Sequence, residues 1–337
     1  MRTDAAIVRS MQTGTYPTLR HPSRYVWDFW YWYDEVEGLF HLLYLNAPPT
    51  LVPSNSHHQV ARVGYATTPD FRSIEWIDDN VMHARPDHWD NTSIWSGDVI
   101  RAAGGYVFFY TSRDRNVDDG WTQNIGIAYS TDMLRWERVD GIRLDPDARY
   151  YEERNVPGDD TVHAWRDPYL FYYEGRLHML LAAKSPNFPP TRKGSVALLR
   201  STDNTFINWE ALPPLFAPGT YSECEVPQIY KHGDNMVLIF SCWARGVQQT
   251  DDGVLHMITG SSLYPPEESF TVEPGVLLRE RDGIYAGRVI PELGGDVVGF
   301  HIEKGGLVRV PRRTGWQLMD RDFSRSNPGF AVSPTET

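Results

Sequence analysis

One pattern of apolar and polar residues recurs five times along this chain of 337 residues. A glycine in a short polar turn precedes a run of alternating or continuous β-branched and aromatic residues, as in EGRLHMLLAA around Gly175. Similar runs follow Gly38, Gly105, Gly233 and Gly295. A glycine turn that leads into such a run is typical of a β-hairpin entering a buried strand. The pattern therefore predicts five hairpins, whose glycines are 67, 70, 58 and 62 residues apart.

A second element recurs between these hairpins. Turns rich in Ser, Thr and Asp lead into strands that carry Trp76, Trp136 and Trp209. Long stretches of helical periodicity are hard to find, so we expect an all-β chain. Five units of roughly 60 to 70 residues, each with several short strands, predict a five-bladed β-propeller.

The propeller accounts for most of the chain. We expect an N-terminal arm over residues 1–24, the propeller over residues 25–324 and a polar C-terminal tail over residues 325–337. No break in composition marks a second domain.

Composition narrows the choice of partners and compartment. The chain is 41% hydrophobic and 13% aromatic, with 12 Trp, which is enough for a sizeable core. The formal net charge of −12 argues against nucleic acids and anionic membranes, because both are polyanionic. The sequence contains neither an apolar stretch long enough to span a bilayer nor the apolar segment of a signal peptide. We therefore expect a cytoplasmic protein.

No metal site or cofactor is expected. Cys224 and Cys242 are too few for a disulfide scaffold and are wrongly spaced for zinc. The histidines, including His57 and His58, lack the spacing of metal ligands, and we expect them in loops. Phosphate-binding and dinucleotide-binding glycine motifs are absent from the sequence.

Three acidic residues occupy related places in the repeats. Asp28 lies 10 residues before Gly38, whereas Asp167 and Glu225 each lie 8 residues before their glycine. In the second repeat this place holds Trp95–Asp98, and in the fifth it holds Tyr285–Arg288. The first strand of each propeller blade lines the central channel. We therefore expect these side chains to converge on one axial pocket.

A pair of carboxyl groups suits glycosidic bond cleavage. One carboxyl with a raised pKa protonates the leaving oxygen, while an ionised one attacks the anomeric carbon or activates water. The alternative is that these acids only cap strands or bind backbone N–H groups. Three acids in related positions favour the catalytic interpretation.

At these residues the sequence resembles glycoside hydrolase family 32, the invertases, levanases and inulinases, with family 43 as a relative. The resemblance covers about residues 25 to 310. The Arg-Asp-Pro motif of the family is intact at residues 166–168, and Glu-Cys-Pro is matched by Glu225-Val226-Pro227. The family's Phe-Ser-Gly-Ser corresponds to residues 95–98, and its Phe-Tyr-Ala-x-Gln corresponds to residues 283–290. Asp28 keeps the Asp of the family's Asn-Asp-Pro-Asn-Gly motif, before a well-matched strand.

The resemblance implies a retaining hydrolase of β-fructofuranosides such as sucrose or fructo-oligosaccharides, with the propeller as its catalytic domain. Asp28 would be the nucleophile, Asp167 the transition-state stabiliser and Glu225 the acid/base. Glu223, two residues away on the same strand face, is the alternative acid, but the repeat spacing and Pro227 favour Glu225. The residues expected to contact the sugar are Trp27, Trp95, Ser96, His163, Arg166, Glu223 and Tyr285. For the tryptophans, ordinary core packing is an equal alternative.

Other functions remain open at this point. An inverting arabinofuranosidase or xylosidase like those of family 43 is the nearer alternative. A non-catalytic glycan-binding propeller is the other, although a lectin needs no acidic trio. Family 32 enzymes carry a C-terminal β-sandwich that covers one side of the propeller. The chain ends after the fifth repeat, so we expect a homo-oligomer to cover that side.

Overall fold

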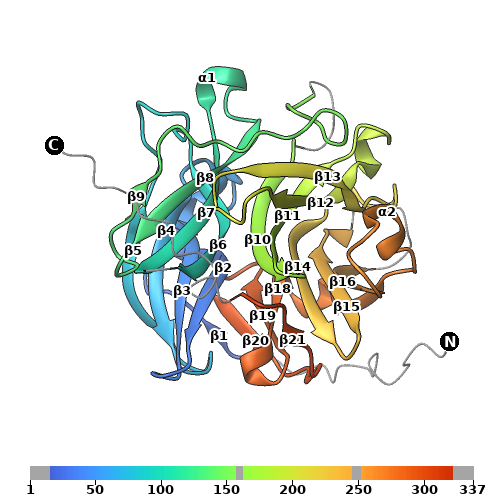
Figure 1. Ribbon diagram of the computed structural model, residues 1–337. Coiled ribbons are helices and arrows are strands. Elements are labelled where there is room, and N and C mark those ends of the chain that lie inside the picture. The colour runs from blue at the N-terminus through green and yellow to red at the C-terminus, as the bar shows by residue number, and fades with distance from the viewer. Residues whose placement is uncertain (1–15, 103, 157–161, 245–251, 322–337) are drawn as a thin grey trace.

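The computed structural model describes residues 16–102, 104–156, 162–244 and 252–321. Their strands form five antiparallel sheets arranged around a central axis, which confirms the predicted five-bladed β-propeller (Figure 1). Among the described residues, no helix is long and apolar enough to cross a membrane.

Each blade is a sheet of four or five strands. Blade one contains β2 (Tyr25–Asp34), β3 (Leu39–Ala47), β4 (Arg62–Thr68) and β5 (Glu75–Met82). Blade two contains β6 (Ile94–Ala102), β7 (Gly105–Arg113), β8 (Gln123–Ser130) and β9 (Glu137–Arg138). Blade three contains β10 (Trp165–Tyr173), β11 (Arg176–Lys184), β12 (Gly194–Ser201) and β13 (Trp209–Phe216).

The last two blades each include a strand from a chain end. Blade four contains β14 (Glu225–His232), β15 (Asn235–Ser241), β16 (Gly253–Gly260), β17 (Gly275–Arg279) and β21 (Gln317–Leu318). Blade five contains β18 (Ile284–Ile290), β19 (Asp296–His301), β20 (Leu307–Val310) and β1 (Thr18–Leu19). Short helical turns lie in the connections: α1 (Arg115–Asp118), α2 (Pro266–Ser269), η1 (Pro49–Leu51), η2 (Ser56–Gln59), η3 (Pro190–Arg192), η5 (Glu280–Asp282) and η6 (Pro291–Leu293).

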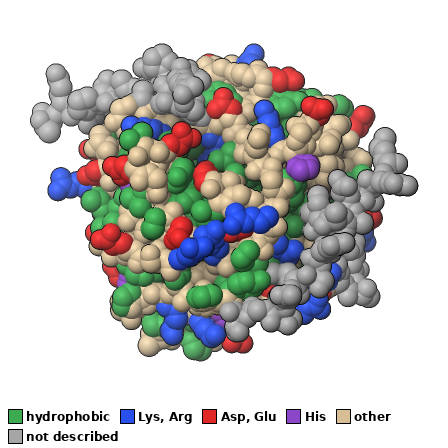
Figure 2. All heavy atoms as spheres, turned by 90° about the horizontal axis from the view of Figure 1, so that it is seen from below, with side chains coloured by type: hydrophobic (Ala, Val, Ile, Leu, Met, Phe, Trp, Pro, Cys, Tyr) green, Lys and Arg blue, Asp and Glu red, His purple; other side chains and the backbone are tan. Residues whose placement is uncertain are grey.

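The core lies between neighbouring blades. Inner and middle strands such as β10 and β11 are buried along almost their whole length, because blades pack against both of their faces. The outer strand β5 is mostly exposed or half-buried and is correspondingly polar. On the face drawn in Figure 2, basic and acidic side chains are interspersed with apolar ones, as is usual for a surface in water.

The N-terminal segment belongs to the propeller. Thr18 and Leu19 of β1 pair with Val308 and Leu307 of β20, so that blue and red strands lie side by side in Figure 1. The predicted arm over residues 1–24 therefore includes the outermost strand of blade five. This pairing joins residues 18–19 to the last blade and closes the ring of blades.

The C-terminal segment closes one end of the axis. β21 pairs with Tyr230 and Lys231, near the end of the inner strand β14, and Asp320 bridges to Tyr172 near the end of β10. Arg321 then forms a buried ion pair with Asp98 on the inner strand of blade two. The contacts of β21 and Asp320 lie at the opposite end of β14 and β10 from Glu225 and Asp167, whereas Asp98 lies in the middle of β6. The predicted tail over residues 325–337 lies outside the described residues.

Candidate active site

Every inner strand carries a β-bulge near the same level. An extra residue in a bulge bends the strand and re-aims its side chains. In three of the bulges a residue other than glycine has a positive φ, namely Asp167 (58°), Val226 (50°) and Ala286 (49°). The bulges lie between Val26 and Phe29, Trp95 and Gly97, Arg166 and Tyr169, Glu225 and Gln228, and Tyr285 and Arg288.

The bulge explains how an Arg and an Asp next to each other in sequence serve one site. In a regular strand, adjacent side chains point to opposite faces. Here Arg166 reaches the carboxylate of Glu225, while Asp167 accepts a hydrogen bond from the backbone N–H of Val226 at 3.0 Å. Both therefore face the same segment of blade four.

The predicted alignment of Glu225 with Asp167 in their strands is wrong by one residue. Counting back from the glycines puts Glu225 level with Asp167, but the strand pairing puts it level with Arg166, directly before the bulge. The reason is the turn, since Gly175 is the second of two residues between paired positions, whereas Gly233 is the first. The acids nevertheless meet, because blades three and four are neighbours.

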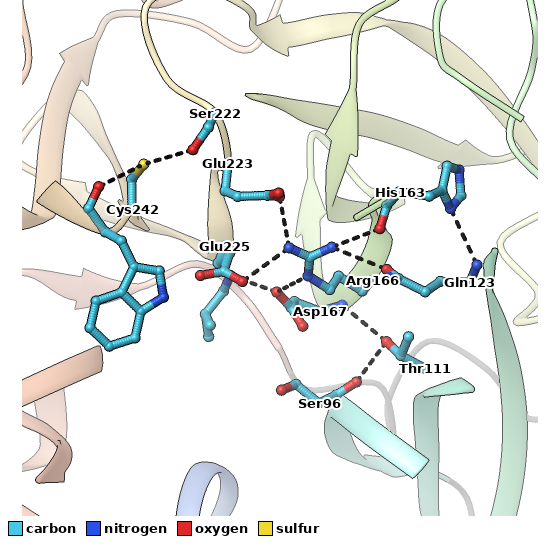
Figure 3. Close-up of polar contacts among 12 residues, drawn as sticks. Ser96, Thr111, Gln123, His163, Arg166, Asp167, Ser222, Glu223, Glu225 and Cys242 are labelled. Carbon is cyan, nitrogen blue, oxygen red and sulfur yellow. Dashed lines mark hydrogen bonds and ion pairs between the residues drawn. The ribbon is translucent and has the colours of Figure 1, made fainter. Parts of the chain in front are cut away.

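Hydrogen bonds through blade two link Asp28 and Asp167. The hydroxyl of Ser96 donates to Asp28 Oδ2 at 2.5 Å. Thr111 Oγ1 accepts the backbone N–H of Asp167 at 3.1 Å and donates to the carbonyl of Ser96 at 2.8 Å (Figure 3). These bonds tie the positions of the two aspartates, on blades one and three, to blade two between them.

Arg166 lies among three carboxylates, those of Glu223, Glu225 and Asp167 (Figure 3). Its Nη2 donates to Glu223 Oε2 at 2.7 Å and to Glu225 Oε1 at 3.0 Å, and its Nε lies 3.7 Å from Asp167 Oδ2. The surrounding negative charges raise the pKa of Arg166 despite its burial, so the guanidinium is a permanent cation.

Glu223 and Glu225 have different surroundings. Both oxygens of Glu223 are bound by cations, Oε1 by Lys184 Nζ at 2.6 Å and Oε2 by Arg166. Glu225 shares Arg166, but its other oxygen accepts a hydrogen bond from the phenol of Tyr285. The ring of Tyr285 stacks on Trp243, with centroids 4.0 Å apart. Glu225 is also the more accessible carboxylate, with a side-chain exposure of 21% against 13% for Glu223.

The carboxyl groups perturb each other's ionisation. Desolvation raises the pKa of Asp28 to about 7, and the charges of Asp167 and Glu225 add to this, while the bond from Ser96 opposes it. Desolvation and the charge of Glu225 raise the pKa of Asp167 to about 6, against the effect of Arg166. Carboxyl groups with such perturbed and coupled pKa values are characteristic of catalytic sites.

The sequence did not indicate a role for Arg288 in the site. This residue is buried in β18 of blade five, and its Nε donates to the carbonyl of Phe29, next to Asp28, at 2.6 Å. Its charge lowers the pKa of both Asp28 and Asp167, in opposition to desolvation. The only sequence signal was that Arg288 belongs to Tyr285–Arg288, the segment of the fifth repeat that corresponds to the acids of the other repeats.

His163 does not have the expected orientation toward a sugar. Its Nδ1 accepts the backbone N–H of Gln123 at 3.2 Å, and its Nε2 donates to the carbonyl of Glu152 at 2.9 Å. Burial lowers the pKa of His163 to about 4, so the ring is neutral. Its carbonyl accepts from Arg166 Nη1 at 3.1 Å. His163 therefore positions Arg166 and has no ring nitrogen left for a hydroxyl group.

The two predicted tryptophans differ in accessibility. Trp27 is only 3% exposed and packs edge-on against His57, which favours the core-packing alternative. Trp95 is half-buried, and the guanidinium of Arg113 lies 4.3 Å from the centroid of its ring. Of these two rings, Trp95 is the one accessible to a ligand.

A possible metal-binding group lies elsewhere. In the described part of the chain, candidate ligand atoms of Asp34, Glu37 and His41 lie within 4.8 Å of one another. They surround the turn after β2, at the opposite end of this strand from Asp28. The Nδ1 of His41 is already hydrogen-bonded to the hydroxyl of Tyr65 at 2.7 Å.

Comparisons with known proteins agree with the propeller fold and give the family. Residues 31–288 match the family model described as the glycosyl hydrolases family 32 N-terminal domain. An inulosucrase from Halalkalicoccus jeotgali bound to kestose is 20% identical, with a TM-score of 0.66 over 86% of this chain and 79% of that one. The catalytic domain of a β-fructofuranosidase from Microbacterium saccharophilum K-1 is 18% identical, with a TM-score of 0.65 over 88% and 78%. Levansucrase from Bacillus subtilis is 14% identical, with a TM-score of 0.66 over 90% and 87%.

Proposed function

Because the chain belongs to glycosyl hydrolase family 32, we propose that it cleaves β-fructofuranosides, such as sucrose or a fructo-oligosaccharide, with retention of configuration. The observation that carries this proposal is the convergence of three acids: Arg166 binds Asp167 and Glu225, and the charges of these two carboxylates act on the buried Asp28. The similar structures support the choice of sugar, since their names describe enzymes of fructose-containing sugars.

In the proposed first step, Asp28 attacks the anomeric carbon of the fructosyl unit. The bond from this carbon to the leaving oxygen breaks. In the reactive form of the coupled carboxyl pair the shared proton lies on Glu225 while Asp28 is ionised, and Glu225 gives this proton to the leaving oxygen. The bond from Ser96 keeps one oxygen of Asp28 oriented while the other reacts. The product of this step is a fructosyl–enzyme ester.

In the second step, Glu225 accepts a proton from water as the water attacks the same carbon and releases Asp28. Tyr285 and Arg166 hold Glu225 in place through both steps. Asp167, fixed by the N–H of Val226, is placed to bind sugar hydroxyl groups more strongly as positive charge develops on the ring.

The experiment is a substrate panel with stereochemical analysis. The purified protein is incubated with sucrose, kestose, 4-nitrophenyl arabinofuranoside and 4-nitrophenyl xyloside, and the first-formed anomer is identified by NMR. We expect fructose to be released as the β-anomer. Activity confined to the arabinofuranoside or xyloside, with inversion, would instead support the family 43-like alternative.

Two further expectations stay predictions from the sequence, namely the cytoplasmic location and self-association. Light scattering over micromolar concentrations tests the second, and a monomer mass throughout would contradict it.

A further inference from the structure

His58 belongs to η2, in the connection between β3 and β4 of blade one. Its ring lies edge-on to two tryptophans beside the acidic site, with centroid distances of 5.7 Å to Trp27 and 5.9 Å to Trp95. Trp27 directly precedes Asp28, and Trp95 directly precedes Ser96, which is bonded to Asp28. The imidazole therefore lies next to the two strand segments that hold the proposed nucleophile.

The backbone around His58 is held firmly. The carbonyl of His58 accepts the indole N–H of Trp95 at 2.9 Å. Arg113, which stacks on Trp95, donates from Nη2 to the side-chain oxygen of Gln59 at 2.8 Å. The backbone at His58 is thus fixed before any ligand binds, and the contacts with Trp27 and Trp95 restrict the ring, which lowers the entropic cost of using it.

The ring nitrogens of His58 are uncommitted. The ring is half-buried, and within the part of the chain that the structure describes neither nitrogen has a hydrogen-bond partner. This distinguishes His58 from His163, whose two nitrogens are both bonded to backbone groups. A half-buried polar group of this kind can bind a ligand without breaking an existing bond within the protein.

The charge state of His58 suits a hydroxyl group. Burial and the neighbouring His57, Arg113 and Arg166 lower the pKa of His58 to about 3. A neutral imidazole offers one N–H donor and one acceptor nitrogen, and a sugar hydroxyl can satisfy either. The influence of Arg166 also indicates that the ring lies near the guanidinium that binds Glu223 and Glu225.

We propose that His58 hydrogen-bonds a hydroxyl group of the sugar unit that binds over Asp28, and thereby contributes to the choice of sugar. The identity of that unit as a fructofuranosyl group rests on the proposed function. His58 stays neutral throughout and transfers no proton in either step. It is a substrate-binding residue that the spacing of the sequence motifs does not reveal.

The test compares His58→Phe with the matched variant His57→Phe. His57 is buried and packs edge-on against Tyr25 and Trp27, so this control changes the neighbouring ring without touching the proposed contact. With sucrose as substrate, His58→Phe should lower kcat/KM by about 10- to 100-fold, the effect of losing a hydroxyl contact in a binding site. His58→Gln should recover part of this loss, and His57→Phe should stay within about twofold of the wild type.

The pH profile gives a second readout. Because His58 is neutral over the working range, the limbs of the kcat/KM profile should keep their positions in His58→Gln. A limb that moves would assign His58 a proton-transfer role and overturn the proposal. Equal losses in His58→Phe and His57→Phe would also overturn it, since they would indicate a packing effect on the loop.

A binding measurement separates this proposal from the proposed function. Calorimetric titration of the inactive Asp28→Asn protein with fructose, arabinose and xylose, with and without His58→Phe, needs no turnover. Weaker binding of one sugar after His58→Phe supports the contact, even if that sugar is not fructose and the proposed substrate is wrong. Unchanged binding of every sugar that binds would refute the contact, even if the wild type hydrolyses sucrose.

Discussion

Glu223 and Glu225 are chemically identical side chains two positions apart, and their partners assign them different roles. Arg166 and Lys184 hold the two oxygens of Glu223, whereas Glu225 contacts Arg166 and the phenol of Tyr285. The charge of Glu225 raises the pKa of both Asp28 and Asp167, so Glu225 is electrostatically coupled to the other two acids. We therefore assign the acid/base role to Glu225 and a positioning role to Glu223.

Substitution of these two residues should separate the roles. Glu225→Gln should lower turnover of sucrose by about 10²- to 10⁴-fold, the usual contribution of a general acid–base group. The loss should be smaller with a 4-nitrophenyl leaving group, which needs little protonation. Glu223→Gln should lower both activities by the same factor, because it acts through Arg166. A leaving-group dependence in Glu223→Gln, with Glu225→Gln active, would reverse the assignment.

Ionised Asp28 serves the proposed reaction but lowers the free energy of unfolding, because its charge is buried. Its pKa rises from an ordinary value of 3.8 to about 7 on folding. Between these values the folded protein holds a proton that the unfolded chain releases. The stabilising effect of that proton is complete below the unfolded pKa and is lost as the pH rises through the folded pKa.

Asp28→Asn should therefore raise the free energy of unfolding at pH 8 by about 1–3 kcal/mol, while it abolishes turnover. The gain should be smaller at pH 5, where Asp28 is already protonated in the folded protein. Urea unfolding at the two pH values measures the difference, with the exposed Asp234→Asn as the control. A gain at pH 5 equal to that at pH 8 would contradict the raised pKa.

The bulged inner strands are the elements that assemble the site. Each bulge adds a residue at the level of the acids, and the positive φ of Asp167, Val226 and Ala286 carries a conformational cost of about 1–3 kcal/mol each. Such backbone strain is often found at functional sites. In β14 the bulge exposes the N–H of Val226, which then binds Asp167.

The inner strand of blade five contributes through Arg288 rather than through an acid. Because the charge of Arg288 lowers the pKa of Asp28 and Asp167, Arg288→Met should raise both values. The acidic limb of the kcat/KM profile should then move to higher pH by about 0.5–1 unit. The matched control is Arg101→Met, an exposed arginine 3.8 Å from Asp34. If the acidic limb does not move in Arg288→Met, Arg288 does not tune the aspartates, and its role is limited to the hydrogen bond with the carbonyl of Phe29.

The closed ring depends on the first and last described segments of the chain. β1 completes blade five, and the segment from β21 to Arg321 runs from the end of β14 past the end of β10 to the middle of β6. There Arg321 pairs with Asp98, and its guanidinium carbon lies 4.5 Å from the centroid of the Tyr169 ring. The side-chain exposure of the pair is only 11% and 1%, so its energetic weight is that of a buried ion pair.

Arg321→Met should lower the free energy of unfolding by about 3 kcal/mol, because it leaves Asp98 buried without its cation. The double variant Arg321→Met/Asp98→Asn should recover at least half of this loss, since Asn can still accept the N–H of Leu170. Urea unfolding measures both. If the single variant is as stable as the wild type, the C-terminal segment does not stabilise the propeller.

The sequence was sufficient for features that rest on local signals. Glycine turns followed by β-branched and aromatic runs act over about ten residues, and they predicted five blades correctly. Asp28, Asp167, Glu225 and Arg166 could be selected because each lies at a nearly constant distance from such a turn. The intact Arg-Asp-Pro motif then supplied the family, which the match over residues 31–288 supports.

The arrangement of the site required the tertiary structure, because it depends on groups that are distant in sequence. Whether Glu225 is level with Asp167 or Arg166 depends on bulges and strand pairing, which the glycine spacing does not reveal. His163 turns away because backbone groups from two other segments bind its ring, while His58 keeps its nitrogens open between Trp27 and Trp95. Residue types and local periodicity determined the blades and the candidate acids, whereas contacts between blades decided which side chains meet and in which ionisation state. Local patterns cannot specify those contacts, because burial and charge at the axis are properties of the closed ring.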